Sequence, residues 1–261
     1  MAHTLDGAKA GTRPVSFLYN GGPGAASLWL HMGPFSPVRL LTDSPNPTPG
    51  PPFKLVNNDD SLLDKPRKPP CAFRLHASAK RCCAMTARLW TAMTCGLRAS
   101  TLRPRTRAPV TTPQTPEFWR AFVAALHGYL DGELKYQRDD AYRPSADSIG
   151  QWERKHRRTS GRPGMSPGGE QSQPYVATDL ASAIRKNPHL KVFSANGYFD
   201  LATPLFATEY DLAHMGLASE LRANVQFGYY PSGHMIYLNI ESLHKLKSDL
   251  AAFITGAQKQ K

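Results

Sequence analysis

Three short stretches of the chain hold residue types that chemistry at a carbonyl group requires. The first, Asn20-Gly21-Gly22-Pro23-Gly24, is rich in glycine. Glycine can take positive φ values and bring backbone N–H groups close to a developing oxyanion. The other two stretches end in, or contain, Asp200 and His234. Because a carboxylate that orients an imidazole makes it a general base, the three stretches predict an oxyanion site and an acid–base pair.

Each stretch also has an ordinary structural interpretation. Asn20-Gly21 is typical of a tight turn. Asp200 precedes Leu-Ala-Thr-Pro and is typical of a turn residue, and His234 fits a loop histidine that faces solvent. On the residues alone, both interpretations stay open for each stretch.

The three stretches follow segments with the pattern of β-strands. These segments are Val15 to Tyr19, Leu190 to Ser194 and Val225 to Tyr230. In open α/β sheets, catalytic groups collect on loops at the carboxyl ends of the strands. The sequence therefore predicts that the glycine-rich stretch, Asp200 and His234 lie at one edge of a sheet.

Helical patterns alternate with these strands. Four of the predicted helices are Ala25 to His31, Thr178 to Lys186, Pro204 to Met215 and Glu241 to Ile254, and the first of them is stopped by Gly33-Pro34. A further predicted helix starts at Pro116, and its apolar face is formed by Phe118, Phe122, Leu126, Tyr129 and Leu130. Residues 41–52 and 161–174 are rich in Pro, Gly and Ser and are predicted to be loops. The alternation of strands and helices predicts a mostly parallel α/β sheet with flanking helices.

The charge of the chain is concentrated in one segment. Between Lys65 and Pro116 there are eleven basic and no acidic residues, which account for +11 of the formal net charge of +12. The same segment contains all four cysteines, Cys71, Cys82, Cys83 and Cys95, and seven prolines. It shows no sustained strand or helix period, so we expect irregular, disordered structure from 65 to 115.

The composition excludes several classes of protein. With 261 residues, 20 Gly and 23 Pro, the chain is neither collagen-like nor a coiled coil, and it is long enough to bury a sizeable core. It contains no run of about 18 apolar residues, and its first residues have neither the basic head nor the apolar stretch of a signal peptide. We therefore expect no membrane span and no export signal in the chain as written.

Several stretches together resemble the serine carboxypeptidase family of α/β hydrolases, especially its bacterial members. The resemblance rests on Arg13 to Gly24, Ser27 to Gly33, Lys54 to Asp64 and Asn187 to Ile254. It covers about 130 to 180 residues, depending on how much of 116–186 is counted. Proteins of this family are typically exported, and the N-terminus of this chain begins inside a family segment.

The resemblance implies a role for each candidate residue. Gly22, with Gly21 beside it, would form the oxyanion hole, and Asn20 would bind the terminal carboxylate of a peptide substrate. Asp200 would be the acid and His234 the base of a catalytic triad. The chain order of nucleophile, Asp and His expected of an α/β hydrolase also fits. The implied activity is release of C-terminal residues from peptides, with no cofactor and no metal.

The chain departs from the family where the nucleophile should be. Between Asp64 and Pro116 the family has a Gly-Glu-Ser-Tyr-Gly elbow, which is absent here, so the nucleophile is unknown and we expect the chain as written to be inactive. Ser166 in Gly164-Met-Ser-Pro-Gly168 fits G-x-S-x-G. However, Pro167 has no N–H for an oxyanion hole, and no apolar strand precedes Ser166.

Three interpretations compete for residues 65–115. The cysteine spacing does not fit a zinc site. The charge fits a nucleic-acid-binding arm, but aromatic residues are few and no recognised module is present. The abrupt boundaries, the excess of Arg, Pro and Cys and the lack of acids fit out-of-frame sequence together with a deletion, which we favour.

These observations give one set of expectations. The fold class is α/β, an α/β-hydrolase-like sheet incomplete in its centre. Its parts are residues 1–64 with the oxyanion loop, the basic segment 65–115, and residues 116–261 with the Asp and His loops. The expected function is that of a serine-type carboxypeptidase in a defective or fragmentary copy. The alternative is a non-enzymatic protein that binds nucleic acid or another polyanion through residues 65–107.

Overall fold

The structure is a computed structural model that describes the chain in eight parts. They are residues 3, 16–21, 25–62, 116–136, 142–145, 156–157, 170–171 and 176–259. The basic segment 65–115 and its cysteines lie outside the described residues, as do Gly22 and Ser166. The described part combines helices with three two-stranded sheets and is of the mixed α/β class.

A pair of parallel strands lies at the centre of the C-terminal part. Strand β5 (Val192–Gly197) pairs with β6 (Val225–Tyr230), with Val192 opposite Val225 and Gly197 opposite Tyr230. Parallel neighbours need a long crossover, and here it contains α5 (Leu205–Ala213) and α6 (Ser219–Arg222). The predicted parallel pairing is thereby confirmed. Strand β6 has the predicted bounds, whereas β5 starts two residues later and ends three residues later than predicted.

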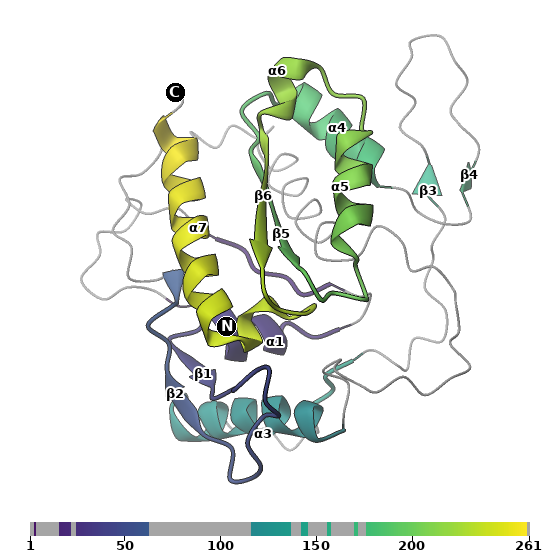
Figure 1. The fold of residues 1–261 in the computed structure, drawn as a ribbon. Helices are drawn as coiled ribbons and strands as arrows, with labels where there is room; N and C mark the ends of the chain where they lie inside the picture. The colour runs from purple at the N-terminus through teal and green to yellow at the C-terminus, as the bar shows by residue number, and fades with distance from the viewer. Residues whose placement is uncertain are drawn as a thin grey trace.

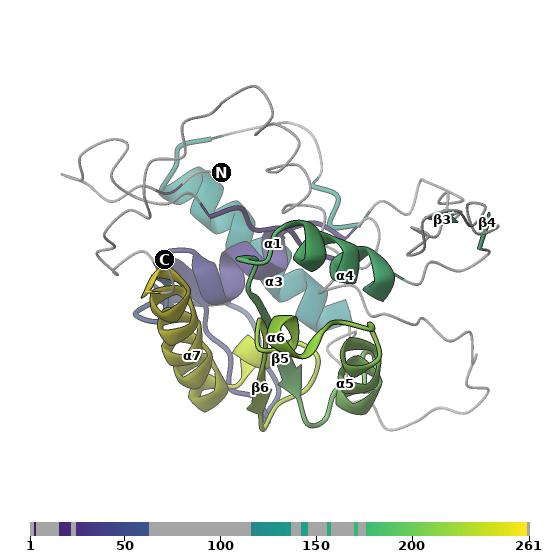
Figure 2. The same ribbon diagram turned by 90° about the horizontal axis from the view of Figure 1, so that it is seen from above.

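Two helices flank this strand pair on opposite sides. Helix α7 (Ile240–Lys259) lies on one side and α5 on the other, as Figures 1 and 2 both show. Tyr230 is fully buried, and its hydroxyl donates a hydrogen bond of 2.9 Å to Asp249 Oδ2 on α7. Lys245 donates to the same oxygen at 2.6 Å. The bond from Tyr230 joins β6 to α7, and the one from Lys245 lies within α7.

A third helix, α4 (Ala177–Lys186), covers the start of the strand pair. Its apolar residues recur at helical spacing and form a core with β5 and α5; they are Ala177, Leu180, Ala181 and Ile184, packed with Val192 and Leu212. The predictions of helices at 178–186, 204–215 and 241–254 are confirmed, with ends shifted by a few residues.

The N-terminal part is built around helix α3 (Pro116–Gly132), which confirms the helix predicted from Pro116. Its buried residues Phe118, Phe122, Leu126 and Tyr129 lie at i, i+4, i+8 and i+11 and face Trp29. The ring of Trp29 stacks on Phe118 with centroids 5.7 Å apart. This aromatic contact joins α3 to the short helix α1 (Leu28–Leu30).

A π-helical segment, η1 (His31–Phe35), follows α1 and is interrupted by a kink at Gly33, where the sequence predicts the helix to stop. The backbone leaves helical geometry at Gly33, with φ −100° and ψ −108°, because the ring of Pro34 sterically disfavours the helical conformation of the residue before it. Strand β1 (Val38–Leu40) follows and pairs antiparallel with β2 (Leu55–Asn57). Between them, residues 41–52 form no helix or strand, which confirms the predicted loop.

Two predictions about regular structure were wrong. Residues 16–19, the described part of the strand predicted at 15–19, form no strand, and Phe17 is 60% exposed. An extended segment needs a neighbouring strand for its backbone hydrogen bonds, and no described residue pairs with it. Within the loop predicted at 161–174, β4 (Glu170–Gln171) pairs antiparallel with β3 (His156–Arg157).

The N-terminal and C-terminal parts pack against each other beyond β6. The side chains of Met235, Tyr237 and Leu238 pack on the core around α3. A Cβ atom on Gly33 would lie 2.6 Å from the Tyr237 ring, so glycine is required for this approach. The Thr42 hydroxyl donates to the carbonyl of Leu238 at 3.0 Å. The segment that follows His234 is therefore in contact with the N-terminal part of the chain as well as with β6.

Candidate functional site

Asp200 and His234 lie on loops that leave the carboxyl ends of β5 and β6. Asp200 comes three residues after Gly197, and His234 comes four residues after Tyr230. Because β5 and β6 are parallel neighbours, both loops leave the same edge of the strand pair. The structure therefore brings Asp200 and His234 to the same edge, although the crossover from β5 to β6 separates them in the sequence.

The two side chains are in direct contact. His234 Nδ1 lies 2.9 Å from Asp200 Oδ2, a hydrogen-bond distance. The Asp200 side chain is 8% exposed, whereas that of His234 is 42% exposed. The pair thus consists of a buried carboxylate and an imidazole that reaches solvent.

Backbone hydrogen bonds hold the two loops beside each other. The N–H of Tyr198 donates to the carbonyl of Tyr230 at 2.9 Å, and the N–H of Phe199 donates to that of Ser232 at 3.0 Å. A Cβ atom on Gly197 would lie 2.5 Å from the carbonyl oxygens of Ser232 and Gly233. Only glycine leaves room for this approach, so Gly197 sets the distance between the loops.

Four donors surround the Asp200 carboxylate. Oδ1 accepts hydrogen bonds from the backbone N–H groups of Ala202 and Thr203, each at 2.8 Å. Oδ2 accepts from the Thr203 hydroxyl at 2.5 Å and from His234. The turn interpretation of Asp200 and its pairing with His234 are both correct, because one oxygen caps the turn and the other contacts the imidazole.

The pKa values of the pair move apart. Burial raises the pKa of Asp200, but hydrogen bonds from His234 and Thr203 stabilise its charged form and lower its pKa overall. The hydrogen bond from Asp200 raises the pKa of His234, burial lowers it, and attraction to the Asp200 charge raises it further. The net result is a raised pKa for His234, as expected for an imidazole that accepts a proton beside a carboxylate.

The tautomer of His234 follows from its partners. Asp200 Oδ2 is an acceptor, so Nδ1 carries the proton in the neutral ring and Nε2 has a free lone pair. Within the described part of the chain, Nε2 has no hydrogen-bond partner. The pair can therefore take up and release a proton at an exposed nitrogen.

The glycine-rich stretch is not joined to this pair by any hydrogen bond among the residues that the structure describes. The N–H of Asn20 donates to Ser27 Oγ at 3.2 Å, and Asn20 Nδ2 donates to the Gly21 carbonyl at 3.0 Å. Residues 20 and 21 are assigned no turn, and the residues that follow, 22–24, lie outside the described part of the chain, so the turn interpretation of Asn20-Gly21 stays open. Gly22, the main oxyanion-hole candidate, lies outside the described residues.

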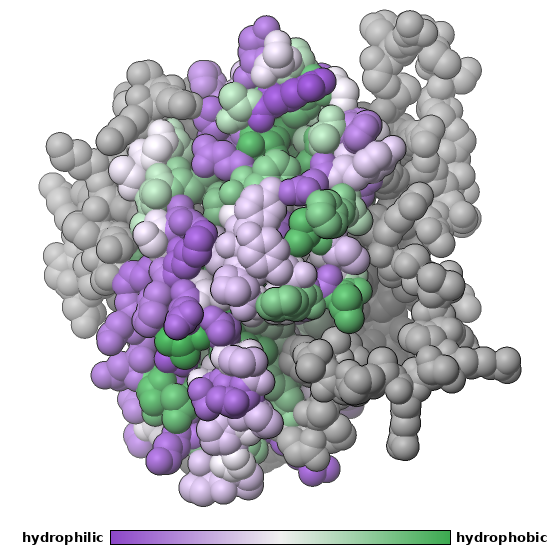
Figure 3. Space-filling model, in the orientation of Figure 1, coloured by the Kyte–Doolittle hydropathy of each residue, from purple (hydrophilic) through white to green (hydrophobic). Residues whose placement is uncertain are grey.

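Exposed apolar side chains surround the Asp200 loop. Figure 3 shows hydrophobic surface (green) over α5 and the loop that leads into it. The side chains that are more than half exposed in this part are Tyr198, Phe199, Leu201, Phe206 and Tyr210. Large apolar side chains are therefore accessible beside the acid–base pair.

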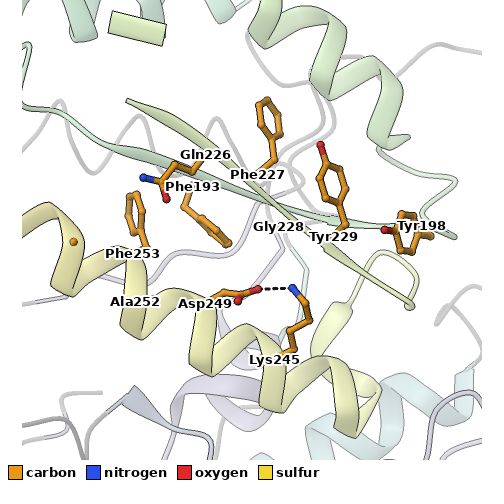
Figure 4. A pocket seen from close by; sticks show the side chains of 11 residues that line it. Phe193, Tyr198, Gln226, Phe227, Gly228, Tyr229, Lys245, Asp249, Ala252 and Phe253 are labelled. Carbon is orange, nitrogen blue, oxygen red and sulfur yellow. Dashed lines mark hydrogen bonds and ion pairs between the residues drawn. The ribbon is translucent and has the colours of Figure 1, made fainter. Parts of the chain in front are cut away.

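An open groove of about 560 Å³ lies between β6 and α7 (Figure 4). Lys245 and Asp249 form an ion pair along one wall, and the rings of Phe193 and Phe253 approach within 5.5 Å. The residues that line it include Tyr198 but neither Asp200 nor His234. We therefore do not assign this groove to the acid–base pair.

Two residues of the site, Gly197 and Thr203, are not among the candidates predicted from the sequence. The signal for Thr203 was present, because an Asp followed three residues later by Thr and then Pro is typical of a turn that leads into a helix. The signal for Gly197 was weaker, because a glycine at a strand end has many uses. Its function depends on the approach of a loop 35 residues away.

The described residues contain no cluster of three or more side chains able to hold a metal ion. None of the helices in the described ranges has the length and apolar character needed to cross a bilayer. Comparison of the chain with family models, curated proteins and solved structures finds no match. What the site can do is therefore deduced from its own residues and contacts.

Proposed function

We propose that the chain carries the acid–base half of a serine hydrolase site, of the serine carboxypeptidase type, on an α/β-hydrolase fold that lacks its central strands. The observation that carries this proposal is the 2.9 Å contact between His234 Nδ1 and Asp200 Oδ2 at the ends of two parallel strands. A buried carboxylate that fixes an exposed imidazole is the arrangement by which such a pair activates a hydroxyl nucleophile.

During formation of the acyl-enzyme, the pair would act in two proton transfers. His234 Nε2 takes the proton of a serine hydroxyl as its oxygen attacks the peptide carbonyl carbon, and Asp200 stabilises the imidazolium that forms. The imidazolium then gives this proton to the departing amine as the peptide C–N bond breaks. Water then attacks the acyl ester carbon and gives a proton to His234, and the imidazolium returns a proton to the serine oxygen as the ester bond breaks and the acid leaves. Asp200 accepts a hydrogen bond throughout and does not take the proton.

The substrate and oxyanion contacts follow from the family resemblance. Asn20 would hold the terminal carboxylate of a peptide, and Gly21 and Gly22 would donate backbone hydrogen bonds to the oxyanion. The exposed apolar residues near Asp200, such as Phe199 and Leu201, favour a peptide with apolar side chains at its C-terminal end.

A fluorophosphonate probe and a blocked dipeptide test this proposal. We expect the unmodified chain to give neither labelling nor release of the C-terminal residue, because no serine elbow is found in its sequence. A variant in which an in-frame segment with the elbow replaces residues 65–115 should gain both activities. In that variant His234→Ala should lower kcat by roughly 10⁶-fold, as removal of a triad histidine does in other serine hydrolases.

Two results would contradict these expectations. Stoichiometric labelling of the unmodified chain would show that a nucleophile is present after all, and peptide mapping would identify it. A folded elbow variant that reacts no faster than its His234→Ala counterpart would exclude the pair from catalysis.

A rival function rests on the concentrated charge of residues 65–107. A polyanion-binding arm would bind a single-stranded oligonucleotide with an affinity that falls steeply with salt and disappears when 65–107 are deleted. If the chain is instead a hydrolase, any binding of the oligonucleotide should show no preference for a particular nucleotide sequence. Salt-sensitive binding that prefers one nucleic-acid sequence would favour the rival.

A further inference from the structure

Thr203 contacts both members of the acid–base pair through one hydroxyl group. Its Oγ1 donates a hydrogen bond of 2.5 Å to Asp200 Oδ2 and lies 3.3 Å from His234 Nδ1. With the 2.9 Å contact between Nδ1 and Oδ2, the three atoms form a closed triangle. A threonine hydroxyl has one proton and two lone pairs, so it can donate to the carboxylate and accept from the imidazole at the same time.

Hydrogen bonds hold both oxygens of the Asp200 carboxylate. Oδ1 is bound by the N–H groups of Ala202 and Thr203 at 2.8 Å, which fixes one end of the carboxylate. The hydroxyl of Thr203 binds the other oxygen, Oδ2. Thr203 thus binds both oxygens of Asp200, one with its main chain and one with its side chain.

The sequence prepares Thr203 for this contact. Pro204 follows it at the N-terminal boundary of α5, with φ −56° and ψ 134°. A proline restricts the backbone of the preceding residue to extended conformations. The β-branched side chain of threonine adds a stiff χ1 angle. The hydroxyl therefore costs little conformational entropy when it binds Asp200.

We propose that Thr203 is a positioning residue that holds Asp200 Oδ2 in line with His234 and accepts part of the Nδ1–H hydrogen bond. The role rests on the proposed function of the pair. A methyl group in place of the hydroxyl would leave Oδ2 with His234 as its one side-chain donor and free the carboxylate to turn about its backbone-bound oxygen. The imidazole would then lose both the aligned carboxylate and the shared acceptor.

The titration of His234 reports this role directly. Of the charged groups in the described part of the chain, Asp200 is the one that raises the pKa of His234. A misaligned carboxylate stabilises the imidazolium less, so the pH midpoint of His234 should fall. A purely competitive role, in which Thr203 draws charge away from Oδ2, predicts the opposite shift.

NMR titration of the full chain provides the experiment. The Cε1–H signal of His234 is assigned by its loss in His234→Gln, and its midpoint is compared in the parent, Thr203→Val, Thr203→Ser and Asp200→Asn. We expect Thr203→Val to titrate between the parent and Asp200→Asn, and Thr203→Ser, which keeps the hydroxyl, to match the parent. Thr208→Val, the same change within α5, is the matched control and should also match the parent.

The outcomes separate this inference from the proposed function. An unchanged or raised midpoint in Thr203→Val, or a shift in Thr203→Ser as large as that in Thr203→Val, would overturn the positioning role alone. An unchanged midpoint in Asp200→Asn would instead show that the pair does not interact and would overturn both proposals. If Thr203→Val does not fold, Thr203→Ala removes the same hydroxyl without the second methyl group and takes its place.

Discussion

The Asp200–His234 loops and the Asn20–Gly21 segment differ in what holds them. The first two loops leave paired strands, and backbone hydrogen bonds such as Phe199 N–H to the Ser232 carbonyl join them. Asn20 and Gly21 bind each other and Ser27, and residues 16–19 before them pair with no described strand. The Asp200 and His234 loops thus take their relative position from the pairing of the strands before them.

The difference extends to burial. Asp200 lies at the end of β5, whose residues Val192, Ser194 and Asn196 are buried. Phe17, Leu18 and Tyr19 are exposed although they are large and apolar. In a complete sheet, such residues would be covered on both faces by helices. The N-terminal segment thus has the composition of a strand without the surroundings of one.

The largest expected effect comes from the core that supports both parts. Phe122 is fully buried against Trp29, so Phe122→Ala should lower the free energy of unfolding by about 3–5 kcal/mol. Phe206→Ala removes the same atoms from a side chain that is 77% exposed, so it should change the free energy of unfolding by less than about 0.5 kcal/mol. Urea denaturation measures both. Equal losses would show that the exposed surface on α5 is covered in solution.

The approach of the two loops can be tested at Gly197. A Cβ atom there would collide with two backbone carbonyl oxygens at 2.5 Å, so Gly197→Ala should cost about 1–3 kcal/mol of stability and separate Asp200 from His234. Gly128→Ala is the matched control, because no atom lies within 4 Å of its Cβ position in α3, and it should stabilise the chain by up to about 1 kcal/mol. A Gly197→Ala variant as stable as the parent would contradict the close approach.

The contact between Asp200 and His234 should make the stability of the chain depend on pH. The pKa of His234 is raised above its ordinary value of 6.5, so its contribution is complete below about pH 6.5 and is lost as pH rises through the folded pKa. The pKa of Asp200 is lowered below 3.8, so its contribution is present above that value and is lost as pH falls through the folded pKa. Stability from this pair is therefore greatest between these two ordinary values.

Urea denaturation at pH 5.5 and pH 8.5 measures the His234 contribution. The parent chain should lose more stability between these values than either His234→Gln or Asp200→Asn, since each variant removes one partner. The same pH dependence in all three proteins would show that the contact contributes nothing to folding.

The smallest effect is expected at the surface of α7. Lys245 bonds Asp249 and lies 4.6 Å from the centre of the Tyr230 ring, but it is half exposed. Lys245→Ala should therefore lower stability by about 0.5–1 kcal/mol, and high salt should weaken the effect. Lys247→Ala on the same helix provides a comparison at a lysine that contacts the Asp59 carbonyl instead. A loss above that range for Lys245→Ala would mark the pair as part of the core.

The two parts of the chain also differ in how well their sequence predicted them. Residues 176–259 contain β5, β6 and three helices near their predicted bounds, and the core formed by α4, β5 and α5 lies wholly within this segment. The predicted strand ending at Tyr19 failed because its pattern specifies an extended, half-buried segment but not the neighbour that would bury it. The hairpin of β1 and β2 was missed because three-residue strands are too short to show alternation.

The sequence by itself determined which residue types stand at the strand ends: Gly197 and Asp200 after one apolar run, and His234 after the next. These follow from local patterns of burial and turn formation. Only the tertiary structure decided that Asp200 Oδ2 meets His234 at 2.9 Å and that Thr203 completes the contact. Those distances depend on the parallel register of β5 and β6 and on Gly197 passing two carbonyl groups, and register is a relation between segments that no single segment encodes.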